Sequence, residues 1–71
     1  MEKTVEIVKT AIGWHVTRRY CGRSIATQFF STVAKDLDKK KTESAREKAI
    51  KKAYDDAVKA KNDYVQAWVG A

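Results

Sequence analysis

The residues GWHVTRRYCGRSIATQF, from Gly13 to Phe29, decide the fold of this chain. β-Branched and aromatic side chains alternate with polar ones on both sides of Cys21-Gly22, a dipeptide that can turn the chain because glycine accepts a positive φ. This pattern predicts a β-hairpin. If Tyr20 lies opposite Arg23, one face carries Trp14, Val16, Ile25 and Phe29. The other face then carries His15, Thr17, Arg19, Ser24, Ala26 and Gln28.

The flanking segments predict a third strand and a helix. Val5 and Ile7 precede a loop at Thr10–Gly13 and predict a strand before the hairpin. After residue 42 the chain consists largely of Ala, Lys, Glu and Asp, and Ser44 and Glu47 form a capping-box pair. Apolar residues recur there at spacings of three and four, which is one helical face: Ala49, Ala53, Ala57, Ala60, Tyr64 and Trp68, with Ile50 beside them. Gly70 stands where a helix commonly ends.

The expected architecture is a single α+β domain over residues 1–71. Strands lie within residues 1–33, a basic loop spans 34–42, and a long C-terminal helix spans 43–69 and packs on the sheet. A three-helix bundle is the alternative, because two apolar sets in the first half also have helical spacing. These sets are Val5, Val8, Ile12 and Val16, and Ile25, Phe29, Val33 and Leu37.

Composition excludes several classes of protein. No stretch approaches the roughly 18 apolar residues of a membrane span, and residues 1–10 do not have the pattern of a signal peptide. Cys21 is the one cysteine and His15 the one histidine, so neither an internal disulfide nor a zinc site is expected. We therefore expect a cytoplasmic protein without cofactor or metal, and one that does not bind membranes.

The net charge of +6 indicates a polyanionic partner, since basic excess favours association with nucleic acid. Residues 1–42 hold nine basic and four acidic residues, so the excess lies mostly in the first half. The arginines near the turn suit phosphate or guanine, an aromatic ring there can stack on a base, and lysines in the loop suit phosphate. The candidate contact residues are His15, Arg18, Arg19, Tyr20, Arg23, Gln28, Lys39, Lys40 and Lys41.

Catalytic patterns are nearly absent from the sequence. There is no glycine-rich phosphate loop, and no nucleophile stands in a recognisable relation to a base. We therefore expect a binding protein rather than an enzyme, with DNA as a more fitting ligand than RNA. The alternative is a small phage-type inhibitor or adaptor that binds a host nucleic-acid-handling or defence complex. The sequence does not determine the oligomeric state.

The segments Gly13–Arg19, Gly22–Phe29 and Ala53–Ala57, which read GWHVTRR, GRSIATQF and AYDDA, resemble the plant APETALA-type DNA-binding domain. In outline the chain is also similar to the arm-binding domains of phage tyrosine integrases. The resemblance implies a three-stranded sheet laid in the DNA major groove, with contacts from Arg18, Arg19, Arg23 and Gln28. It covers under a third of the chain, and Ile25 stands where the family has a tryptophan.

Overall fold

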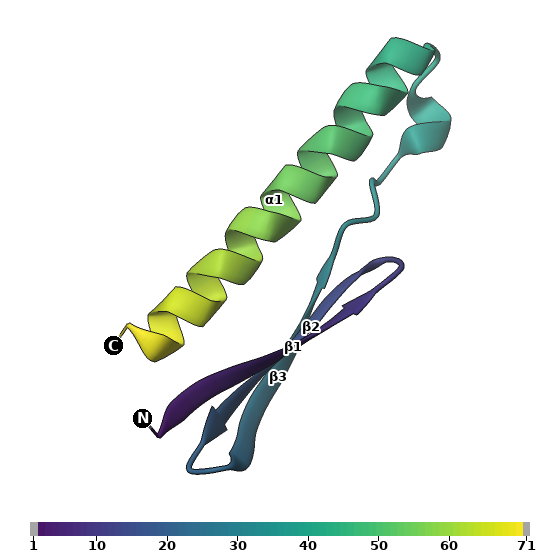
Figure 1. Ribbon diagram of the computed structural model, residues 1–71. Coiled ribbons are helices and arrows are strands. Elements are labelled where there is room, and N and C mark those ends of the chain that lie inside the picture. Colours follow the sequence, from purple (N-terminus) through teal and green to yellow (C-terminus); the bar gives the residue numbers. More distant parts are fainter. Residues whose placement is uncertain (1, 71) are drawn as a thin grey trace.

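The computed structural model describes residues 2–70 and contains a three-stranded antiparallel sheet with one long helix against one of its faces (Figure 1). The strands are β1 (Lys3–Thr10), β2 (Gly13–Tyr20) and β3 (Arg23–Ser31), with β2 in the centre. A short 3-10 helix, η1 (Leu37–Lys39), lies in the connection to α1 (Glu43–Val69). The predicted α+β arrangement is therefore confirmed, and the three-helix bundle is wrong.

Both connections within the sheet are two-residue turns. Cys21 and Gly22 have positive φ angles of 50° and 82°, the backbone conformation of a turn whose twist matches that of the flanking strands. The predicted turn at Cys21-Gly22 is thus confirmed. At the other turn, Gly13 has φ 153°, and a Cβ on this residue would collide with the carbonyl oxygen of Phe30. Only glycine fits at position 13 without a shift of the neighbouring strand.

The pairing of β2 with β3 changes register at a β-bulge. Tyr20 is opposite Arg23 as predicted, but the pairs Arg19–Ser24 and Arg18–Ala26 leave one extra residue in β3. An extra residue moves every later side chain to the other face of the sheet. The predicted register was therefore wrong beyond the bulge. Trp14 is opposite Phe30, which is buried, while Phe29 lies on the other face; Ala26 and Gln28 change face as well.

The core lies between the sheet and the middle of α1. Its buried members are Trp14, Val16, Phe30 and Ala57, with Val5, Val58, Tyr64 and Val65 packed around them. The expectation that Ala57 faces the sheet is confirmed. Ile50 was expected to widen the same stripe, but its side chain is half exposed and is not among the residues packed against the core.

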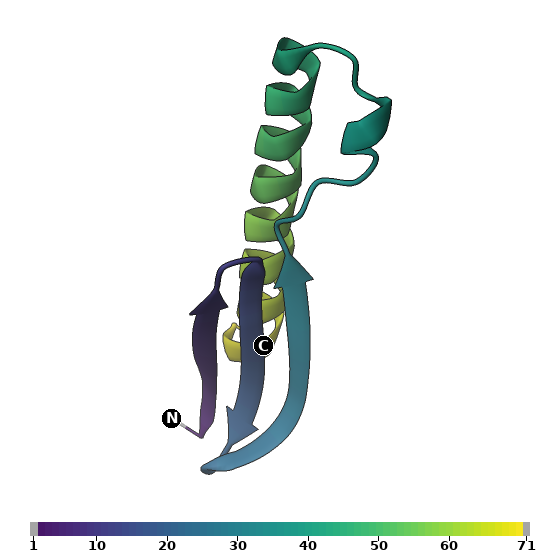
Figure 2. The same ribbon diagram turned by 90° about the vertical axis from the view of Figure 1, so that its right-hand side faces the viewer.

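The two ends of α1 are held differently. At the start, the Thr42 hydroxyl accepts a hydrogen bond from the Ala45 amide at 3.1 Å, so Thr42 and not Ser44 is the N-cap. At the end, the indole Nε1 of Trp68 donates to the carbonyl oxygen of Thr4 at 3.0 Å. The first half of α1 extends past the sheet (Figure 2), and the molecule measures 49 × 19 × 13 Å.

Candidate nucleic-acid interface

The sheet face opposite α1 is not covered by any other element of the described residues 2–70 (Figure 2). Directly opposed residues of antiparallel strands share a face, so the register assigns the side chains on this surface. We call it the open face, and its residues are Thr4, Glu6, Val8, His15, Thr17, Arg19, Ser24, Thr27 and Phe29. Of the residues predicted to bind nucleic acid, His15 and Arg19 lie on it.

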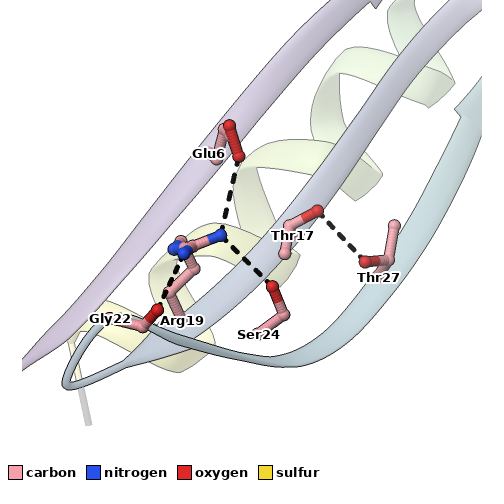
Figure 3. Close-up of polar contacts among 6 residues, drawn as sticks. All are labelled: Glu6, Thr17, Arg19, Gly22, Ser24 and Thr27. Carbon is pink, nitrogen blue, oxygen red and sulfur yellow. Dashed lines mark hydrogen bonds and ion pairs between the residues drawn. The ribbon is translucent and has the colours of Figure 1, made fainter.

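Arg19 is held in place by three neighbours on the open face (Figure 3). Its Nη2 donates to the carbonyl oxygen of Gly22 at 2.7 Å, and its Nη1 donates to the Ser24 hydroxyl at 3.2 Å. The same Nη1 lies 3.8 Å from a carboxylate oxygen of Glu6. The side chain of Arg19 remains 35% exposed, so an ordered guanidinium is presented to solvent with its charge partly balanced.

His15 and Phe29 form an aromatic pair beside this arginine. Their ring centroids are 4.6 Å apart with the planes inclined by 37°, and both residues are exposed. Next to them, the hydroxyls of Thr17 and Thr27 hydrogen-bond across the strands at 3.0 Å (Figure 3). The sequence predicted that Phe29 lies in the core, so it was not recognised as a surface aromatic residue. The β-bulge moves Phe29 to the open face, and nothing in the composition of residues 24–26 indicates that bulge.

Arg18 lies on the other face, between β2 and α1. Its guanidinium carbon is 3.7 Å from the centre of the Tyr64 ring, and its Nη2 donates to the Tyr64 carbonyl oxygen at 2.7 Å. The Nε of Arg18 is buried without a hydrogen-bond partner. This side chain joins the sheet to the helix, so the geometry does not bring it to a ligand on the open face.

The hairpin tip, residues Tyr20–Arg23, is exposed throughout. Tyr20 and Arg23 are paired across the turn and lie on the α1 side of the sheet, beyond the position of Arg18. Within residues 2–70, the Arg23 guanidinium makes no hydrogen bond or ion pair with the protein. Gln28, another predicted contact, pairs with Val16 on the helix side and is therefore not part of the open face.

The lysines of the loop lie at the opposite end of the molecule from the tip (Figure 1). Lys39, Lys40 and Lys41 are exposed, and Lys39 is 3.8 Å from a carboxylate oxygen of Asp36. The loop folds back on α1, where Lys40, Lys48 and Lys52 line a groove of about 330 Å³ over Ala45 and Ala49. We call Lys39, Lys40, Lys41, Lys48 and Lys52 the basic end. Eight of the fifteen basic residues fall between residues 35 and 52, with four acidic ones.

The structure thus separates the predicted contacts into two regions. Arg19 and His15 lie on the open face, with Arg23 and Tyr20 at the nearby tip, whereas the lysines lie at the basic end. The position of Lys48 and Lys52 beside Lys40 was not predicted, because it depends on how the loop packs against the helix. Among residues 2–70 no helix has the length and apolar character needed to span a membrane, and no three metal-ligating side chains gather at one point.

No protein-family model, curated protein or solved structure matches this chain. The resemblance to APETALA-type and integrase arm-binding domains accordingly stays a prediction.

Proposed function

We propose that the protein is a nucleic-acid-binding module whose open face contacts bases and phosphates. The observation that supports this most is the exposed His15–Phe29 pair beside the ordered guanidinium of Arg19, on a sheet face that α1 leaves free. The net charge of +6 supplies the general attraction to a polyanion. No other exposed surface of the described residues combines an aromatic pair with a positioned arginine.

The two kinds of side chain support different contacts. Aromatic rings stack on unpaired bases with little sequence preference, and each such contact contributes about 1–3 kcal/mol. Arginine presents planar donors that suit phosphate oxygens or the edge of guanine. A stacking pair on a shallow sheet favours a single strand over a duplex, and DNA is our first choice of ligand. Arg23 and Tyr20 lie at the tip on the α1 side of the sheet, so a strand bound to the open face would reach them only by passing over the end of the hairpin.

The basic end has a different role in this proposal. Flexible lysines bind phosphate without reading sequence, and their contribution declines steeply with salt. Because the basic end lies at the far end of the molecule from the tip, one short oligonucleotide would not occupy both regions. The open face would therefore bind short strands, and the basic end would add affinity only for longer ones.

The test is fluorescence anisotropy with short labelled single-stranded DNA, duplex DNA and RNA at two salt concentrations. Phe29→Ala should weaken binding of single strands by about 5- to 150-fold, the equivalent of one lost stacking contact. Val8→Ala is the matched control, because Val8 lies in the same cross-strand row on the other side of His15 and removes no ring. Arg19→Gln should reduce the salt dependence by about one phosphate contact.

Lys59→Ala is the second control, because it removes one unit of charge from an exposed position on α1, away from the open face. Its effect should be smaller than that of Arg19→Gln, although the net charge changes equally. If the wild-type protein bound none of the three probes at low salt, the proposal would fail. An inhibitor or adaptor that binds a protein complex would then be the leading interpretation.

A further inference from the structure

The two free edges of the sheet differ in how they are protected. Strands at a sheet edge have unpaired backbone groups, and proteins commonly keep other chains away from them with charged residues or proline. The outer edge of β1 has a charge at every third position: Lys3, Glu6 and Lys9. Along β3 the only charge is Arg23 at its first residue, since residues 24–34, SIATQFFSTVA, contain no charge and no proline.

The backbone of β3 is oriented for pairing along this edge. The Thr32 amide donates to the carbonyl oxygen of Ile12, the residue just before β2. The backbone N–H of Thr32 therefore points to the β2 side and not to the free edge. Because alternate residues of an antiparallel strand turn their N–H and C=O groups to opposite sides, Thr27, Phe29 and Ser31 present theirs to the free edge. Figure 2 shows that no other segment runs beside β3 there. Among residues 2–70, the backbone groups of these three alternate residues therefore have no strand partner on this side.

A groove of about 420 Å³, whose lining includes Lys35 and Asp56 as well as apolar side chains, adjoins the same edge. The end of β3 and the residues after it form one wall, with Phe30 and Val33, and α1 forms the other, with Ala53, Ala57 and Ala60. Val33 and Phe29 are exposed hydrophobic residues at its margin. A strand added to β3 would close the open side of this groove with its own side chains.

The chain exposes more surface than a compact monomer of its size. The chain exposes 5388 Å², whereas a folded monomer of 8.1 kDa exposes about 4500 Å². Its radius of gyration is 15.1 Å, compared with about 11 Å for a compact domain of this length. The excess of about 900 Å² belongs to the whole elongated molecule, in which part of α1 extends past the sheet, so enough surface is exposed for each partner to bury the roughly 800 Å² of a standard interface.

We propose that the free edge of β3 pairs antiparallel with the β3 of a second copy, which gives a twofold dimer with a continuous six-stranded sheet. A second copy fits because an antiparallel edge can be complementary to itself about a twofold axis. Pairing of residues 24–34 with the same residues sets no like charges opposite one another, although each chain carries +6. This inference goes beyond the proposed nucleic-acid binding and does not depend on it.

Sedimentation equilibrium without nucleic acid tests the proposal separately from ligand binding. The wild-type protein should show twice the mass of 8.1 kDa at high concentration. Phe29→Lys places a charge at the free edge of β3 and should raise the dimer dissociation constant at least about tenfold. Val8→Lys is the matched control in the same cross-strand row at the edge of β1, and it should leave the dimer unchanged.

Amide hydrogen exchange of the wild-type protein gives a second measurement that needs no variant. The amides of Thr27, Phe29 and Ser31 should exchange more slowly as the concentration rises through the dissociation constant. The amides of Val5 and Ile7, at the free edge of β1, should not change. A monomer at every concentration, or equal exchange at both edges, would overturn the proposal, as would equal effects of Phe29→Lys and Val8→Lys on the mass.

Discussion

Replacing Arg18 by alanine should destabilise the fold rather than remove a ligand contact. The change deletes the hydrogen bond from Nη2 to the Tyr64 carbonyl and the stacking of the guanidinium on the Tyr64 ring. A hydrogen bond from a charged group contributes about 1.5–3 kcal/mol, and a cation–π contact about 0.5–2 kcal/mol. The buried, unpaired Nε offsets part of this gain, because a polar atom without a partner is costly to bury.

These terms give an expected loss of about 2 kcal/mol. A 71-residue domain has a free energy of unfolding of roughly 4–10 kcal/mol, so the loss is a large fraction of the total. The melting temperature should fall by about 8–16 °C. Arg18→Lys keeps the charge but loses the planar group that stacks on Tyr64, so it should recover less than half of the loss.

Urea denaturation followed by far-ultraviolet circular dichroism measures the free energy of unfolding of each variant. Arg23→Ala is the matched control, because Arg23 is exposed at the tip; it should change stability by less than about 0.5 kcal/mol. Below its melting temperature, Arg18→Ala should bind oligonucleotides no more weakly than Lys59→Ala. The reasoning is refuted if Arg18→Ala is as stable as Arg23→Ala and has lost binding instead.

Three further substitutions test the packing of the sheet and helix. Gly13→Ala should destabilise by about 3 kcal/mol or more, because its Cβ would collide with the backbone of Phe30; thermal melts measure it. Trp68→Phe removes the donor to the Thr4 carbonyl and should cost about 1 kcal/mol in urea denaturation, with the overall fold retained. Ala57→Asp buries a charge against the sheet and should abolish the helical circular dichroism signal; a folded variant would show that α1 packs through another face.

Much of the fold could be predicted because the decisive signals are local. The alternation around Trp14 and Val16 and the turn at Cys21-Gly22 depend only on neighbouring residues, and the alanine spacing that includes Ala57 is regular over several turns. The bulge could not be predicted, since the extra residue at Ile25 has no special composition. This single bulge places Phe30 in the core and Phe29 on the open face, the reverse of the predicted arrangement.

Fewer residues of the candidate site could be predicted, because tertiary contacts decide which side chains lie on the open face. Arg18 and Arg19 are adjacent in sequence, yet one packs against Tyr64, 46 positions away, and the other lies on the open face. Alternation places them on opposite faces, but it does not say that the helix side can accommodate an arginine. The tyrosine ring and carbonyl that make this possible are brought there by α1.

The extension of α1 past the sheet also has a mechanical consequence. The helix contacts the core at Ala57, and about 21 Å of helix separates this point from Glu43, at a rise of about 1.5 Å per residue. With the sheet as a pivot, a rotation of about 10° displaces the start of the helix by about 4 Å. Such a rotation would move the lysines near Thr42, together with the loop that packs on this part of the helix. The distance between the basic end and the open face would change with it.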